Sequence, residues 1–213
     1  KKNCITDEDF RGRQMEKAFN INEGSAAGQA AAFAERLIRA YSRHYNVFRA
    51  SETGEDMAKP VPGELAARCD LHMSESKYIM TEKHVIWQTD CHEYCYIFQT
   101  EHLTKELYEK FLEYAERDGM SRIHPDRNHK CSAITVMVAA DTADREAVKA
   151  LRKCRIHKSF AFSFHGWMDV RTALAVLSAG EVASNFGGHE NAAYLKKLIA
   201  RADKTVTAGE SRK

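Results

Sequence analysis

The sequence has no run of about 18 apolar residues, which is the length that a membrane-spanning helix needs. Its 213 residues are enough for one ordinary domain with a sizeable core. Apolar residues make up 44% and charged residues 29%, close to the average for soluble proteins and unlike disordered chains. We therefore expect a globular unit that has no membrane partner.

The sequence also has little excess of one charge over the other, because its formal net charge is only +2. A balance this small gives no argument for nucleic-acid binding from overall charge, so any electrostatic argument must rest on local clusters. The six cysteines lack the density of a small disulfide scaffold. We expect them to be reduced in a cytoplasmic protein. The chain begins with Lys1, so a removed signal peptide stays an alternative.

The stretch "TDCHEYCYIF", residues 89–98, places two of these cysteines and a histidine among aromatic residues. The spacing between Cys91 and Cys95 is C-x3-C, and no second cysteine pair at a suitable distance completes a zinc motif. The stretch therefore predicts a turn cysteine followed by a core cysteine in a strand. It predicts no disulfide between these two residues and no metal or redox site.

The chain divides by pattern into three segments. Residues 1–58 form an N-terminal helical region and linker, with an amphipathic helix over 26–45 that Ser25 caps and a linker from Arg49. Residues 59–202 form the core domain, and residues 203–213 a flexible tail. The core is expected to contain the following elements in order: short strands at 78–80, 85–88 and 93–99, a helix from Thr104 to Gly119, a strand at 131–140, a helix after Asp144, a strand from Ser159, a hairpin over 168–185, and a last helix after Gly187 and Gly188.

A weak internal repeat indicates how the later strands are connected. "HKCSAITV" begins at His129 and "HKSFAFSF" at His157, with a helical pattern between them. A strand, helix and returning strand form a crossover that makes the two strands parallel. The fold class predicted is α/β, or α+β, with a mixed sheet in which an antiparallel meander meets parallel βαβ crossovers, preceded by an N-terminal helix.

Candidate site residues follow from this topology, because ligands in such sheets bind beyond the carboxyl ends of parallel strands. The residues expected on that one concave surface are Glu101, His102, Asp141, His165, Trp167 and Asp169. We expect His165 to act as acid or base with Asp141 and Glu101, and His102, Asp169 and Trp167 to bind. The alternative is that the acidic residues have loop or helix-cap roles and that His165 is a hydrogen-bonded sheet residue.

The opposite ends of the same strands are basic. Six residues there are candidates for binding phosphate, nucleic acid or an acidic partner: Arg127, Lys130, Arg152, Lys153, Arg155 and Lys158. The alternative is that basic residues at a helix C-terminus only complement the helix dipole.

Two resemblances bear on function. The order of helix, three strands, helix and strand resembles the restriction-endonuclease-like nucleases, but "EYC" from Glu93 and "QTEHL" lack the lysine that nuclease activity needs. "SESKYIMTEKHVIWQTDCHEYCYIF" and "SFAFSFHGWMDVR" resemble a family of uncharacterised bacterial proteins over roughly residues 64–188. That family implies no activity or cofactor.

No nucleophile motif, phosphate loop or metal box occurs in the sequence. The prediction is therefore a non-catalytic small-ligand-binding or assembly protein. The alternative is a hydrolase, metal-dependent or nuclease-like, that uses the histidine and carboxylate cluster. No cofactor is expected, and a divalent metal stays open. The expected partner is a small molecule or a protein, with a homo-oligomer left open and nucleic acid less favoured.

Overall fold

The computed structural model describes residues 28–51, 61–78 and 85–210, with only the backbone described at 75–78, 85–89 and 202–210. The helices and strands in these residues are α2 (Gln29–Tyr41), β1 (Asn46–Arg49), β2 (Leu65–Tyr78), β3 (Val85–Leu103), α3 (Lys105–Arg122), β4 (His129–Ala143), α4 (Arg145–Lys153), β5 (His157–Ser159), a short 3₁₀ helix η1 (Ala161–Ser163), β6 (Trp167–Val176), β7 (Glu181–Ser184) and α5 (His189–Glu210). The predicted cap Ser25, the strand end at 79–80 and Cys4 lie outside the described residues.

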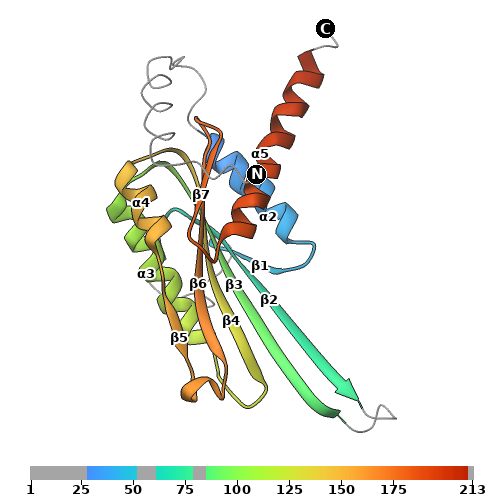
Figure 1. Cartoon of the computed structure of the whole chain (residues 1–213). Helices are drawn as coiled ribbons and strands as arrows, with labels where there is room; N and C mark the ends of the chain where they lie inside the picture. The colour runs from blue at the N-terminus through green and yellow to red at the C-terminus, as the bar shows by residue number, and fades with distance from the viewer. Residues whose placement is uncertain (1–27, 52–60, 79–84, 211–213) are drawn as a thin grey trace, which may run out of the picture.

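The described strands form one mixed sheet in the order β1-β2-β3-β4-β6-β5, with β7 also paired to β6. β3, β4 and β6 are parallel, whereas β1, β2, β5 and β7 pair antiparallel with their neighbours. α3 and α4 are the crossovers between the parallel strands (Figure 1). The α+β fold with an N-terminal helix, an antiparallel meander and βαβ crossovers is thus confirmed.

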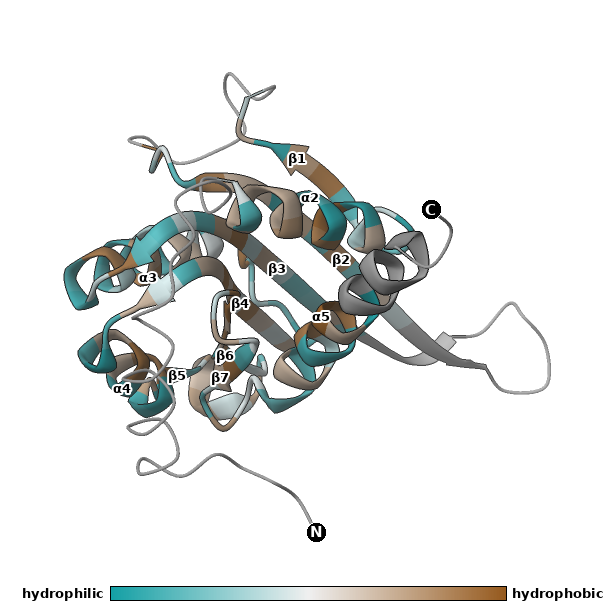
Figure 2. Cartoon of the chain, turned by 90° about the horizontal axis from the view of Figure 1, so that it is seen from above, coloured by the Kyte–Doolittle hydropathy of each residue, from teal (hydrophilic) through white to brown (hydrophobic). Residues whose placement is uncertain are grey.

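The helices cover the sheet in two pairs, which gives three layers (Figures 1 and 2). α3 and α4 pack on one face, where Tyr96, Phe98 and Phe111 lie in the larger apolar core. α2 and α5 pack on the other face, where Phe33 and Leu37 contact the second core. β4 is buried on both faces for most of its length, which explains its continuous apolar run. Although a boundary at residue 58 stays a prediction, α2 and β1 pack on the same sheet as the later elements.

The meander is built from longer strands than the sequence predicts. β2 and β3 pair from residue 65 to 78 and from 85 to 98, and β1 pairs with β2 where a linker was expected to begin. The predicted turn "TDCH" at 89–92 is wrong, because these residues lie inside β3 and their backbones pair with β2 on one side and β4 on the other. Pairing on both sides outweighs the local turn preference of Asp90.

The strand predicted from Ser159 is also misplaced. Only His157–Ser159 are extended, and they run antiparallel to β6, while the third parallel strand begins at Trp167. Ala161, Phe162 and Ser163 have positive φ angles and form a turn. Phe162 and Phe164 are 97% and 84% exposed, so their alternation with smaller residues marks no buried face.

The helix ends agree with the sequence in part. Thr104 caps α3 as predicted, because its hydroxyl accepts a hydrogen bond of 3.2 Å from the Leu107 N–H. Asp144 occupies the N-cap position of α4, but its side chain makes no capping hydrogen bond to the helix. Gly119 does not end α3, which continues to Arg122. Likewise α5 continues to Glu210, so most of the predicted tail is helical.

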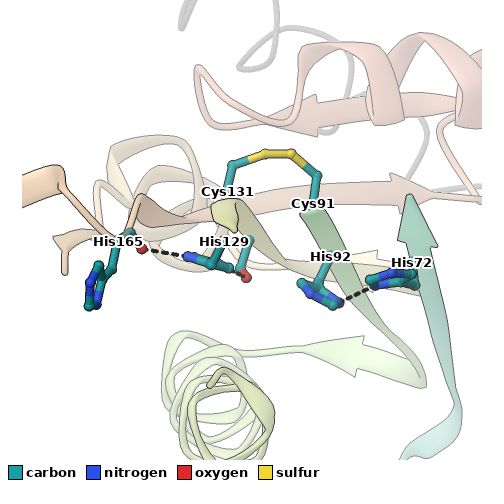
Figure 3. The surroundings of a disulfide bond; sticks show 7 residues. His72, Cys91, His92, His129, Cys131 and His165 are labelled. Atoms are coloured by element: carbon teal, nitrogen blue, oxygen red, sulfur yellow. Dashed lines mark hydrogen bonds between the residues drawn. A yellow bond between two sulfur atoms is a disulfide. The ribbon is translucent and has the colours of Figure 1, made fainter. Parts of the chain in front are cut away.

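Cys91 and Cys131 form a disulfide between β3 and β4, with the two Cα atoms 4.8 Å apart (Figure 3). They face each other in the parallel register, which brings the two side chains to the same side of the sheet. The prediction that all cysteines are reduced is therefore wrong, and the argument from reduced cysteines for a cytoplasmic location no longer applies. The predicted absence of a Cys91–Cys95 disulfide is confirmed, because Cys95 is a free thiol in the core.

Candidate functional site: an arginine groove between two helices

The predicted cluster of six site residues divides between the two ends of the sheet. Glu101, His102 and Asp141 lie at or beyond the carboxyl ends of β3 and β4. Trp167 begins β6 and pairs with Cys131, and His165 precedes it. About ten residues of strand separate that level from Asp141, which is about 33 Å. The prediction of one concave surface is wrong, because the strand expected to end at His165 in fact starts after it.

Asp141 has a structural contact at its end of the sheet. Its Oδ1 accepts a hydrogen bond of 2.9 Å from the Ala30 N–H in the first turn of α2. The N-cap position of α2 is Gly28, which has no side chain to offer, so Asp141 caps this helix from a distant strand. Burial, and then the charge of Glu101, raise the pKa of Asp141, while the bond from Ala30 lowers it.

Three more of the predicted residues, His102, Asp169 and His165, also make contacts within the fold. The two ring nitrogens of His102 contact Thr142 Oγ1 at 2.7 Å and Asp144 Oδ1 at 3.2 Å. Asp169 Oδ1 lies 2.7 Å from His157 Nδ1. The backbone carbonyl of His165 accepts a hydrogen bond of 2.6 Å from His129 Nδ1.

The six predicted anion-binding residues come from several elements, and their role in binding anions stays a prediction. Arg127 lies in the loop before β4, Lys130 at the start of β4, Lys158 in β5, and Arg152 and Lys153 in the last turn of α4. Of the six, only Arg155 lines the cavity of about 610 Å³ beside β6. Arg171 and Phe186 also line that cavity, but so does Asp169, whose carboxylate opposes the arginine charges.

A different basic site lies between α2 and α5, and we refer to it as the arginine groove. It has a volume of about 570 Å³ and is lined by Arg36, Arg39, Ala40, Tyr41, Arg43, His44, Tyr45, Tyr194, Leu198 and Arg201. The lining residues of α2 recur on successive turns of one side of the helix, and those of α5 do the same. Both helices pack on the same face of the sheet (Figure 2), and residues from both of them line the groove.

The side chains described in the groove carry charge of one sign. The described lining includes four arginines and no carboxylate. Glu35 lies next to the groove, but both of its oxygens are bonded to Arg49, at 2.6 and 2.9 Å. The Arg49 hydrogen bond is the main cause of the lowered pKa of Glu35, and the charges of Arg49 and Arg39 lower it further.

Tyrosines form an ordered wall of the groove. Tyr41 is buried and contacts Tyr45 and Tyr194, with ring centroids 4.6 and 6.1 Å apart. The Tyr41 hydroxyl donates to the Met137 sulfur at 3.2 Å, and the Tyr45 hydroxyl donates to Glu93 at 2.8 Å. These contacts to the sheet fix the rings, so the groove has a preformed apolar surface beside its charged side chains.

The sequence contained one signal for this site. "ERLIRAYSRHY" has three arginines and a histidine after Glu35 with no further acidic residue. In an amphipathic helix such residues are expected on a solvated face. That face becomes one wall of a groove because α5, which follows more than 150 residues further along the sequence, packs beside α2.

The fold and the groove together define a three-layer α+β protein with a basic groove on one helical layer. In this chain, residues 29–197 match the family described as Domain of unknown function (DUF8052), and the chain belongs to that family. No curated protein and no solved structure matches the chain. No helix in the described part is long and apolar enough to cross a membrane.

Proposed function

We propose that this protein is a non-catalytic binding protein and that its ligand is a small multivalent anion held in the arginine groove. The observation that carries the proposal is the presence of four arginines, with no carboxylate among the described lining residues, around one groove of about 570 Å³. This volume is typical of sites for small molecules. A guanidinium group binds phosphate or carboxylate through two parallel hydrogen bonds, which matches ligands carrying several such groups.

The separation of the predicted catalytic residues supports binding over catalysis. His165 lies at the opposite end of the sheet from Asp141 and Glu101. Asp141 is bonded to the backbone of α2, so its contact is that of a helix cap. Tyr45 and Tyr194 offer ring faces beside the arginines, which suits a ligand with a planar or apolar part.

The test is a calorimetric titration of the full chain with pyrophosphate and with citrate. We expect saturable binding that weakens as salt is raised, because the attraction is between charges near the surface. Arg39→Gln and Arg43→Gln should each reduce affinity by about 10- to 100-fold, since a hydrogen bond to a charged group contributes about 1.5–3 kcal/mol. Arg145→Gln is the matched control, because it removes the same charge from an exposed position in α4.

Three results would overturn the proposal. The first is that neither anion binds, and the second is that the control loses as much affinity as the groove variants. The third is that a single-stranded oligonucleotide binds the same groove more tightly than pyrophosphate at physiological salt. The last result would replace the small anion with nucleic acid, whose binding is also strongly salt-dependent.

A further inference from the structure

Two histidines face each other across β2 and β3, on the other face of the sheet from the disulfide (Figure 3). His72 and His92 are direct partners in the antiparallel register. Their Nδ1 atoms lie 2.9 Å apart, and their ring centroids 4.4 Å apart. The His72 side chain is 55% exposed, so an ion in solvent can reach the pair.

These two distances describe rings that are turned toward a common point. A straight N–H···N hydrogen bond would place the ring centroids about 5.2 Å apart, because each centroid lies about 1.2 Å behind its nitrogen. Two imidazoles at right angles around one ion, with metal–nitrogen bonds of about 2.05 Å, have nitrogens about 2.9 Å apart and centroids about 4.5 Å apart. The observed separations of 2.9 and 4.4 Å fit the second geometry.

A carboxylate lies near the first ring. Asp90 Oδ1 lies 3.8 Å from Nε2 of His72, the nitrogen that faces away from His92. This separation is too long for a hydrogen bond, so Asp90 acts on the ring only through its charge. Asp90 and His92 are two residues apart in β3, so their side chains project from the same face of the sheet.

A third histidine, His129, lies beside His92 on the same face of the sheet. The two rings stack with their centroids 6.1 Å apart. Both nitrogens of His129 have other partners, the His165 carbonyl at 2.6 Å and Ser132 Oγ at 2.8 Å, so His129 is not proposed as a ligand.

We propose that His72 and His92 bind a divalent transition-metal ion of the nickel, copper or zinc group through their Nδ1 atoms, with water in the remaining coordination positions. Imidazole nitrogen is the ligand that these ions share, and right angles between ligands suit nickel and copper in particular. No group of three or more histidine, cysteine, aspartate or glutamate side chains placed to hold a metal occurs among the described residues. Two protein ligands therefore define an open site.

The test is calorimetric titration of the tag-free, oxidised full chain with Ni²⁺ and with Zn²⁺. We expect one ion per chain. His72→Ala and His92→Ala should each weaken binding by at least about tenfold, because each variant removes one of the two imidazole ligands. His102→Ala is the matched control, because His102 is also half exposed and pairs with a carboxylate, Asp144, at 3.2 Å.

A second measurement separates this site from nonspecific binding. The electron paramagnetic resonance spectrum with one equivalent of Cu²⁺ should show coupling to two imidazole nitrogens in the wild type and to one in His72→Ala. The proposal is overturned if the wild type shows no saturable binding, if either histidine variant binds Ni²⁺ as tightly as the wild type, or if the copper spectrum shows a single nitrogen. Pyrophosphate binding by His72→Ala should equal that of the wild type, because the arginine groove shares no residue with this site.

Discussion

Asp118 is a buried carboxylate, 1% exposed, that joins α3 to the sheet. It accepts a hydrogen bond of 2.6 Å from the Tyr96 hydroxyl and two bonds, of 2.9 and 3.1 Å, from Arg122. Arg68, also 1% exposed, lies 3.7 Å away and donates to Asp70 at 2.9 Å. Each charge in this cluster has a partner of opposite sign, which makes burial of the whole group tolerable.

Replacing Asp118 should remove the carboxylate to which Tyr96 and Arg122 bond, while Arg68 keeps Asp70. We expect Asp118→Ala to reduce the free energy of unfolding by about 3–5 kcal/mol, the usual cost of breaking a buried ion pair. Urea denaturation monitored by circular dichroism measures the change. Glu109→Ala, on the same helix, is the control and should cost less than about 0.5 kcal/mol, because its pair with Lys105 is exposed. Equal losses in the two variants would contradict the prediction.

At the scale of elements, α3 packs against β4 through Gly119. A Cβ atom built on Gly119 would lie 2.7 Å from Cδ1 and 2.8 Å from Cγ1 of Ile134, a side chain that is fully buried. These distances are too short for carbon atoms in contact, so glycine at this position lets the helix approach the strand. The residue continues the helix and does not end it, which is why its role could not be read from the sequence.

This contact reverses the usual effect of a glycine substitution in a helix. Alanine is normally favoured over glycine there by about 1 kcal/mol. We expect Gly119→Ala instead to destabilise the protein by about 1–3 kcal/mol, because Ile134 must move within a packed core. Thermal unfolding followed by circular dichroism measures the difference. Gly63→Ala, where no atom lies within 4 Å of the added Cβ, should change stability little. A stabilised Gly119→Ala variant would contradict this account.

The elements that the sequence predicted are those whose signal is local. β4 has a continuous apolar run, and α3 has a cap at Thr104 followed by apolar residues at helical spacing. β2 was missed because Arg68, Asp70 and His72 interrupt its pattern. Arg68 pairs with Asp70 in the same strand and lies near Asp118 of α3, and His72 faces His92 of β3, so the last two contacts form only in the folded chain.

The candidate site was predicted less well than the fold for the same physical reason. An error of a few residues in placing β6 moved His165 from one end of the sheet to the other. The arginine groove depends on two helices from opposite ends of the chain lying side by side. Neither the strand boundary nor the helix contact is encoded in a short stretch of residues.

At the scale of the whole molecule, the Cys91–Cys131 disulfide links residues that are 40 apart in sequence. A cross-link over a loop of this length stabilises a protein by about 4 kcal/mol, mainly by restricting the unfolded chain. We expect the double variant Cys91→Ser/Cys131→Ser to unfold at a lower urea concentration than the oxidised wild type, with a free energy of unfolding that is lower by an amount of that order. A reducing agent should lower the urea midpoint of the wild type toward that of the variant and leave the midpoint of the variant unchanged. Identical midpoints for oxidised and reduced wild type would contradict the prediction.

The same bond makes part of the backbone a closed ring, which includes the end of β3, all of α3 and the start of β4. Hydrolysis of one peptide bond between residues 92 and 130 opens this ring but does not divide the molecule. A chain cut in the loop that contains the exposed Arg127 therefore keeps its full mass in solution and separates into two fragments only after reduction. A protease can therefore cut the α3 crossover once, and the two fragments stay joined by the Cys91–Cys131 disulfide.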